Sequence, residues 1–319
     1  MTKKRFNELL RLGLYVAITT PLLVSAIYFI LTWNLPQINS ITDYRPPIIT
    51  RVFCENGSLC GEFYLEKRKP ISLSDIPRFI REAFVASEDE RFYEHKGIDL
   101  LSILRAFLKN IAAGEIVQGG STITQQVTKS LLLTPEKKIS RKIKEAILAH
   151  RIERRLQKDE ILTLYLNQIY LGHGAYGIET AAELYFGKKA RDLTEAEGAF
   201  LAGLPKAPAR YSPITHPRRA KARQRYVLDR MIATGYLSRE EAEKIYSQPV
   251  KVKMSREDSV NSRSPYFMEE VRRYLEEKYG SDMIYKEGLS VYTTLDPEIN
   301  SAAQNAIREG LKALDKRQG

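Results

Sequence analysis

The sequence has little of the chemistry that builds metal centres, with 2 cysteines and 4 histidines among 319 residues. The cysteines and the scattered histidines lack the short spacing of zinc ligands, which argues against a structural zinc site. Hydrophobic residues make up 43% of the chain and charged residues 28%. This composition is globular and excludes a disordered or collagen-like chain.

Acidic residues are too few to balance the basic ones. The chain has 39 Asp and Glu against 50 Lys and Arg, which gives a net charge of +11. A surplus of this sign favours acidic partners, namely nucleic acid, anionic lipid head groups or a phosphorylated substrate. Charge alone does not choose among them.

Charge is absent altogether from residues 12–33, a stretch long enough to cross a bilayer as a helix. The basic residues that precede it are Lys3, Lys4, Arg5 and Arg11. They predict a cytoplasmic tail at 1–11 and one transmembrane helix at 12–33, with the rest of the chain outside the cytoplasmic membrane. A signal peptide is the alternative, but the apolar run is long for one and no small-residue cleavage site follows. This topology excludes nucleic acid as a partner.

Residues 34–73 are predicted to form a spacer and a β-hairpin. Strand-like flanks surround Asn56-Gly57, a dipeptide favoured in two-residue hairpin turns. Cys54 and Cys60 lie on opposite flanks in an oxidising compartment, so a disulfide is one interpretation. Two small apolar strand residues are the other, because simple pairing about the turn sets Cys54 opposite Leu59.

Residues 74–247 have a helical pattern almost throughout and are predicted to form one domain. The segment 100–113 has a wide apolar face, which indicates either a core helix or a membrane contact. Ser238 and Glu241 have the spacing of a capping box. The predicted helices cover residues 77–87, 100–113, 134–156, 159–170, 218–234 and 239–246.

Residues 248–319 are predicted to form a separate linker segment. The stretch 248–263 is polar, without a strong core pattern, and indicates a boundary. Beyond it we predict a helix from Ser264-Pro265 to Gly280, a strand at 289–295 and a helix from Pro297.

Three segments carry side chains suited to catalysis. The first, 88–97, begins with three acidic residues, and crowded carboxylates ionise less readily, which suits a general base. A solvated charge run, with Ser87 and Glu90 as a capping box, explains the same residues.

The second segment, 118–129, follows two glycines with hydroxyls and amides that can bind sugar or phosphate oxygens, and Lys129 adds a charge. The alternative is a capping box of Thr122 and Gln125 at a helix start.

In the third segment Lys137, Arg141 and Lys144 fall on one helical face, with Glu145 at its edge. Such a stripe suits a diphosphate leaving group, and the carboxylate could hold a cation. We therefore predict that Lys137 and its neighbours bind substrate. An exposed basic helix with an internal ion pair is the alternative.

Taken in this order, the three segments resemble the motifs of the peptidoglycan glycosyltransferases, glycosyltransferase family 51. The matching patterns are Glu-Asp-x-x-Phe-x-x-His-x-Gly at 88–97, Gly-Gly-Ser-Thr-Ile-x-Gln-Gln-x-x-Lys at 119–129 and Arg-Lys-x-x-Glu at 141–145. The likeness continues through 160–172, 177–188 and 195–213, and so extends over most of 74–247.

The resemblance implies polymerisation of lipid II onto a growing lipid-linked glycan, with inversion at the donor carbon and release of polyprenyl diphosphate. Glu88 matches the catalytic base, and Glu145 matches the second essential carboxylate, near the diphosphate or a bound Mg²⁺. The remaining implied substrate contacts are Ser121, Thr122, Gln125, Gln126, Lys129, Arg141 and Lys144. Asp89, Phe92, His95 and Gly97 are expected to shape the loop that presents Glu88.

The implied fold is mainly α, a lysozyme-like two-lobed helical domain with a small β-hairpin and an N-terminal transmembrane helix. Its smaller lobe would dip into the membrane through residues 100–113. Residues 288–297 resemble the link into the transpeptidase domain of class A penicillin-binding proteins. The sequence lacks Ser-x-x-Lys and Lys-Thr-Gly. We therefore expect it to be the front part of a longer protein.

Two other functions compete with a polymerase. A lysozyme-like hydrolase also needs two carboxylates across a sugar-binding cleft. However, it has little use for a cationic stripe or a membrane anchor. A non-catalytic, membrane-anchored cell-wall scaffold is the second alternative, but it would not require Glu88 and Glu145 within complete motifs.

Overall fold

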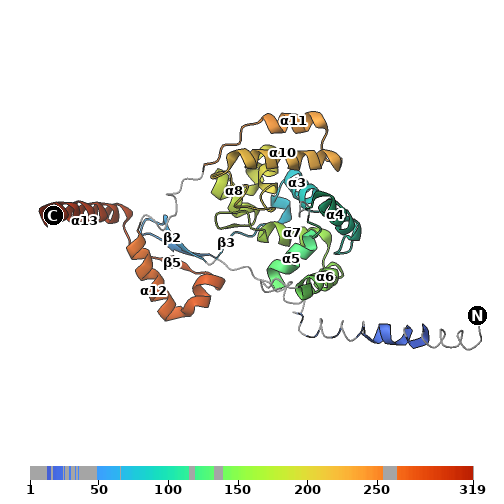
Figure 1. Ribbon diagram of the computed structural model, residues 1–319. Helices are drawn as coiled ribbons and strands as arrows, with labels where there is room; N and C mark the ends of the chain where they lie inside the picture. Colours follow the sequence, from blue (N-terminus) through green and yellow to red (C-terminus); the bar gives the residue numbers. More distant parts are fainter. Residues whose placement is uncertain are drawn as a thin grey trace, which may run out of the picture. The chain divides into compact units, whose positions relative to one another are not determined.

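The structure is a computed structural model that describes residues 49–64, 66–114, 119–132, 139–253 and 264–318, with scattered residues between 13 and 35. Helices dominate these residues (Figure 1). Residues 13–15 and 17–23 of the predicted transmembrane segment are helical. No helix among the described residues has the length and apolar character needed to cross a membrane. The predicted tail at 1–11 and much of 12–33 lie outside the described residues, so the anchor stays a prediction.

The chain divides into two compact units, each built from two stretches of sequence. One unit comprises Met1–Tyr44 and Arg91–Ile161, and the other comprises Arg45–Glu90 and Leu162–Gly319. The segment 74–247 therefore contributes to both units.

In the first unit, helix α5 (Ile123–Leu132) packs against α6 (Ile139–Glu153). The apolar part of their contact is buried. Its buried residues are Ile123, Val127, Leu148, Ala149 and Ile152.

Gly97 lies against the backbone of α6. Its φ is +91°, and a Cβ atom there would stand 2.8 Å from the carbonyl carbon of Ala149. Only glycine combines this conformation with so close an approach. Gly97 therefore fixes the loop that follows residues 88–90, as the sequence predicted for this position.

Helix α4 (Leu100–Ala113) begins at Asp99, whose side chain accepts hydrogen bonds from the backbone N–H and hydroxyl of Ser102. Burial opposes the charge on Asp99, but the Ser102 hydrogen bonds and the Arg91 guanidinium outweigh it and lower the pKa of Asp99. Gly114 ends the helix in the left-handed conformation. Ala106 is the buried residue of α4, so the helix leaves its apolar face on the surface.

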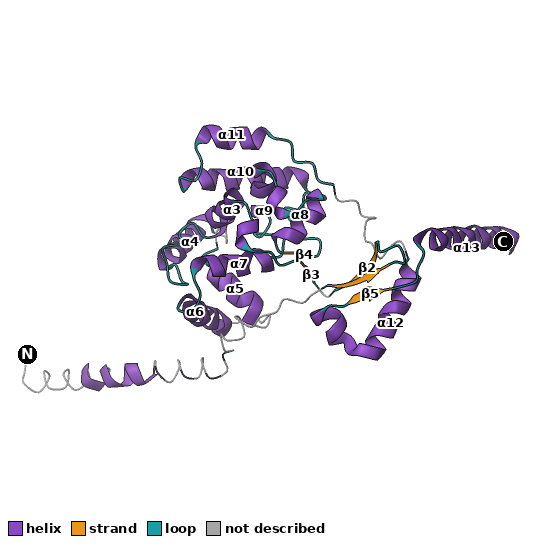
Figure 2. Cartoon of the chain, turned by 180° about the vertical axis from the view of Figure 1, so that it is seen from behind, coloured by secondary structure: helices purple, strands orange, loops and turns teal. Residues whose placement is uncertain are grey.

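The helical core of the second unit is built around α3 (Arg78–Glu88), which packs on α9 (Glu195–Ala202) and α10 (Pro217–Ala233) (Figure 2). A Cβ atom on Gly198 of α9 would meet the Ile80 side chain at 2.6 Å, so glycine permits the close crossing. Phe84 is fully buried in this core. Burial of one such side chain contributes about 1.5–3 kcal/mol.

The other helices of this core are α7 (Lys158–Gln168), α8 (Ile178–Phe186) and α11 (Arg239–Ser247). A capping box of Ser238 and Glu241 opens α11, which confirms that prediction. A second capping box, Thr194 with Glu197, opens α9. The two-residue strands β3 (Lys67–Arg68) and β4 (Ala175–Tyr176) pair in parallel beside α8.

A three-stranded sheet in the same unit has the order β2-β1-β5. Strands β1 (Thr50–Phe53) and β2 (Leu59–Phe63) form the predicted hairpin, and β5 (Ser290–Tyr292) pairs with β1 in parallel. One face of the sheet packs on α12 (Pro265–Asp282) and the short π-helical turn η4 (Met283–Glu287). The buried side chains between them are Val52, Phe63, Met268, Leu275 and Ile284.

A disulfide joins Cys54 to Cys60, with 5.5 Å between their Cα atoms. The hairpin is irregular because its register shifts between Val52 and Phe53, and Phe53 stands opposite Leu59. The shift removes the simple pairing that set Cys54 opposite Leu59. The interpretation of these two cysteines as a disulfide is therefore confirmed.

Several predicted helices end earlier than the sequence indicated. The described part of 134–156 is α6, which stops at Glu153, and α7 stops at Gln168 rather than 170. A turn containing Gly172 and His173, both with positive φ, follows α7.

Near the C-terminus, Gly280 breaks α12 with a φ of +80°, as predicted. The last helix, α13 (Pro297–Gln318), has no buried residue.

Candidate active site

Glu88 is the last residue of α3, and its side chain is half-buried. The helix end is fixed by neighbours, since the Ser87 hydroxyl lies 3.2 Å from the carbonyl oxygens of Phe84 and Ala202. Glu88 therefore stands at a fixed helix end, with part of its side chain accessible. This position suits a group that must accept a proton.

The acidic residues after Glu88 are not a solvated charge run. Asp89 is buried and caps the C-terminus of α3, and Glu90 forms an ion pair with Arg230 of α10. The helix continues through Ser87, so the alternative capping box of Ser87 and Glu90 is wrong.

Phe92 and His95, the predicted loop-shaping residues of the first unit, are both buried. The Lys158 ammonium lies 4.5 Å from the centre of the Phe92 ring and donates to the carbonyl oxygen of His95. His95 Nδ1 accepts a hydrogen bond from the backbone N–H of Gly97. These contacts stabilise the loop and are consistent with a structural role for both residues.

Glu145, on α6, is a carboxylate that is only 2% exposed. Its Oε2 lies 2.6 Å from the Lys142 ammonium, and its Oε1 lies 3.2 Å from Arg141 Nε. The Arg141 contact does not have hydrogen-bond geometry, so Oε1 accepts no hydrogen bond from the described residues. A buried carboxylate of this kind is stable only with compensating positive charge.

Lys142 is the site residue that the sequence interpretation missed. Its ammonium donates both to Glu145 and to the Ser121 hydroxyl, at 2.6 and 2.8 Å. The i, i+3 spacing from Lys142 to Glu145 carries this signal in the sequence. The interpretation instead favoured the i, i+4 pair of Arg141 with Glu145, which the structure also contains.

Thr122 and Gln125 form the capping box that was the alternative for their segment. The Thr122 N–H donates to Gln125 Oε1, and the Gln125 N–H donates to Thr122 Oγ1. Both side chains are buried, and the Thr122 hydroxyl donates to the carbonyl oxygen of Gly97. Their polar atoms hold the start of α5, and the sugar-binding role that the resemblance implies for these two residues stays a prediction.

The remaining predicted substrate contacts are more accessible. Lys129, in the last turn of α5, is exposed, while Ser121, Gln126 and Lys144 are half-buried. Lys137 lies outside the described residues.

The surroundings of Glu145 do not fit a magnesium ion. Mg²⁺ takes oxygen ligands and is held through carboxylates. The charges paired with Glu145 are those of Arg141 and Lys142, and both repel a divalent cation.

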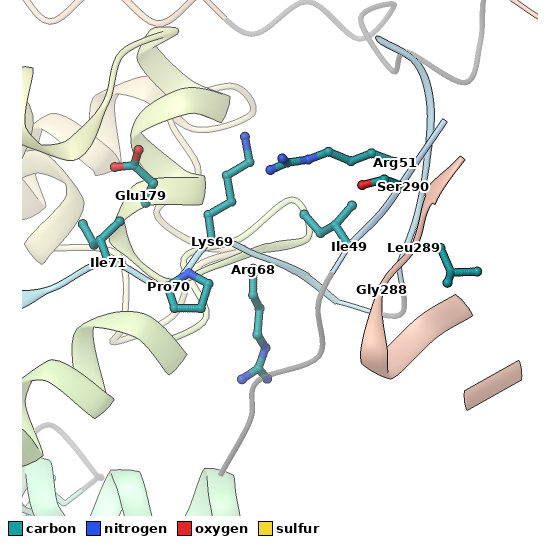
Figure 3. A pocket seen from close by; sticks show the side chains of 10 residues that line it. All are labelled: Ile49, Arg51, Arg68, Lys69, Pro70, Ile71, Glu179, Gly288, Leu289 and Ser290. Atoms are coloured by element: carbon teal, nitrogen blue, oxygen red, sulfur yellow. The ribbon is translucent and has the colours of Figure 1, made fainter. Parts of the chain in front are cut away.

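A separate pocket of about 320 Å³ lies in the second unit (Figure 3). The side chains of Arg51 and Lys69 extend into the same space there. Lys69 is paired with Glu183. The residues that line the pocket do not include Glu88.

Comparison with known proteins identifies the family of the chain. The sequence profile of a family described as "Transglycosylase" matches residues 56–232. The chain belongs to the transglycosylase family. The matched region contains Glu88, Glu145 and the cations around Glu145, so the resemblance noted in the sequence is confirmed.

Relatives of this transglycosylase include penicillin-binding proteins 1A of several bacteria. The protein of Aquifex aeolicus is 45% identical over 305 residues, which cover 96% of this chain and 41% of the relative. That of Neisseria lactamica is 42% identical over 89% of this chain and 35% of its own length. The transglycosylase chain therefore spans about two fifths of the length of these relatives.

A solved structure resembles this transglycosylase in fold. The crystal structure of penicillin-binding protein 1A from Haemophilus influenzae matches with a TM-score of 0.54 and 26% identity. The match covers 86% of this chain and 31% of the crystallised one.

Proposed function

We propose that this transglycosylase is a peptidoglycan glycosyltransferase that polymerises lipid II into glycan strands. The observation that carries the proposal is the buried, cation-paired carboxylate Glu145 within the Transglycosylase match. A hydrolase that only cleaves glycans has no need of clustered cations. A polymerase that releases a diphosphate does need them.

Glu88 acts as the general base in this reaction. It takes the proton from the 4-hydroxyl of the acceptor sugar as the hydroxyl oxygen forms its bond to the anomeric carbon of the donor. The bond from that carbon to the diphosphate oxygen breaks in the same step, so the configuration is inverted. The half-buried position of Glu88 at a helix end supports this role.

Arg141 and Lys142 neutralise the diphosphate as it leaves, with Lys129 and Lys144 as further cations. Glu145 holds the first two in place. Because this carboxylate is buried and paired, it serves as an anchor for cations rather than as a nucleophile. Arginine and lysine bind phosphate oxygens by charge-assisted hydrogen bonds. No step in this scheme uses a metal ion.

Polymerisation of labelled lipid II by the full chain in detergent tests this function. We expect long, lipid-linked glycan, in similar yield with Mg²⁺ or with a chelator because the surroundings of Glu145 do not fit the ion. Short sugars free of lipid would indicate the hydrolase instead. Binding of lipid II without any product would indicate the scaffold.

We also propose that the chain is anchored by residues 12–33 and that α4 lies in the outer surface of the membrane. The exposed apolar residues of α4 are Leu100, Leu101, Ile103, Leu104, Phe107, Leu108 and Ile111. Soluble proteins rarely expose so continuous an apolar face, whereas interfacial helices bury one among lipid acyl chains. A lipid-linked substrate would then reach the enzyme within the bilayer surface.

Leu104→Glu combined with Leu108→Glu is expected to lower polymerisation in liposomes by at least about tenfold, since each leucine loses about 1.5–3 kcal/mol of burial. Activity in detergent should change little. The matched control is Ile307→Glu with Leu311→Glu on α13, a pair with the same spacing and similar exposure. Equal losses in liposomes for both pairs would contradict the membrane contact.

A further inference from the structure

Tyr165 is a residue of the helical core whose hydroxyl packing alone does not explain. The residue lies on α7 and is 2% exposed. Its hydroxyl is buried and has no hydrogen-bond partner among the described residues. A hydroxyl removed from water without a partner destabilises the fold, and phenylalanine would fill the same space without this cost.

The hydroxyl lies in the electrostatic field of the candidate base. Burial first, and then the charges of Glu88 and Asp89, raise the pKa of Tyr165 well above its ordinary value. The Tyr165 ring also meets Phe84 edge to face, with 6.3 Å between ring centres, and Phe84 lies one turn before Glu88 on α3. The tyrosine thus packs against α3 one turn before Glu88.

The other charges near this helix end are already compensated. Glu90 is paired with Arg230, the cation that α10 brings to this end of α3. On α9, Glu197 is paired with Lys188 and closes its own capping box. Glu88 and Asp89 are the carboxylates whose negative charges raise the pKa of the Tyr165 hydroxyl.

We propose that Tyr165 is a positioning residue for Glu88, with a hydroxyl that donates a hydrogen bond to the Glu88–Asp89 carboxylates when Glu88 is charged and ready to accept the substrate proton. The inference rests on the proposed function of Glu88 as general base. The contact forms by a small movement of the α3 end or through one buried water.

The chemistry requires a donor that does not ionise. Because the phenol is harder to deprotonate than usual, it stays a donor throughout the working range and does not compete with Glu88 as a base. A neutral donor stabilises the carboxylate without supplying a counter-charge. Glu88 alone therefore takes the acceptor proton, and Tyr165 keeps its own.

Tyr165→Phe tests the proposal, with the pH–rate profile of lipid II polymerisation as the readout. Without the donor, the Glu88 carboxylate is easier to protonate, so we expect the acidic limb of the kcat/KM profile to move to higher pH. Below the limb, kcat/KM should fall roughly tenfold relative to the wild type. The rate on the alkaline plateau should stay near that of the wild type. Below the limb, where Glu88 is protonated and the hydroxyl lacks this acceptor, the Tm should remain the same or rise.

Tyr185→Phe is the matched control. Tyr185 is equally buried in the same unit, but its hydroxyl donates to the carbonyl oxygen of Leu171 at 2.8 Å. Its removal should lower the Tm and leave the acidic limb unchanged.

A uniform rate loss in Tyr165→Phe without movement of the limb would overturn the proposal, and so would an unchanged profile. If instead the wild type makes no polymer, or Glu88→Gln keeps full activity, the proposed function fails. That failure is distinguishable from failure of the role of Tyr165.

Discussion

Glu88→Gln is expected to abolish polymerisation of lipid II. The amide has nearly the shape of the carboxylate but cannot accept the proton of the acceptor hydroxyl, so the loss in kcat should be at least about 10²–10⁴-fold. Lipid II binding and the Tm should stay close to the wild type, because Glu88 ends its helix without belonging to the apolar core. The measurement is the initial rate of glycan formation, with binding of labelled lipid II assayed separately.

Glu94→Gln is the control for this substitution. Glu94 lies six residues further on, is exposed, and forms a surface ion pair with Arg91. Exposed ion pairs contribute about 0–1 kcal/mol, so this variant should polymerise normally. If Glu88→Gln polymerises lipid II as fast as Glu94→Gln does, another group is the base.

Glu145→Gln should reduce kcat by roughly 10²-fold or more. Without the carboxylate, Arg141 and Lys142 lose the charge that holds them in place, and the diphosphate loses preorganised stabilisation, which commonly contributes this much to catalysis. Rates at saturating lipid II should fall more than the apparent affinity, because the diphosphate gains charge as the bond breaks. Single-turnover kinetics with labelled donor separate these two effects.

Glu153→Gln is the comparison within the same helix. Glu153 has a side chain that is 6% exposed, pairs with Lys158 at 2.7 Å and accepts from the Thr124 hydroxyl. Glu153→Gln should lower the Tm at least as much as Glu145→Gln does, but it should reduce kcat less. If the two variants lose activity in proportion to stability, the role of Glu145 is structural.

Sequence patterns that involve only neighbouring residues predicted several turns and helix ends of this chain. The Asn56-Gly57 turn, the Ser238–Glu241 capping box and the break at Gly280 each depend on a few neighbouring residues, and all three are present. The Thr122–Gln125 box was also visible in the sequence. The substrate role that the motif resemblance implies for the same two residues stays a prediction.

Features that depend on distant residues were not predictable from one sequence. The pairing of β1 with β5 joins residues more than 230 positions apart, and neither strand contains a signal for its partner. The unpaired hydroxyl of Tyr165 was equally invisible, because tyrosine on an apolar helix face indicates only core. Lys142 was missed although it lies inside a recognised motif, since spacing alone does not show which neighbouring cation turns toward Glu145.

The parallel pairing of β1 and β5 has a mechanical consequence. The chain enters this sheet at the start of β1 and leaves it after β5, with the whole stretch 66–253 inserted between. Tension applied between residue 49 and α13 therefore pulls the two strands in opposite directions along their length. Backbone hydrogen bonds such as Arg51 to Leu289 and Thr293 to Phe53 then carry the load together in shear. This route does not pass through the helices that hold Glu88 and Glu145. Stretching the chain between these points therefore leaves Glu88 and Glu145 unstrained.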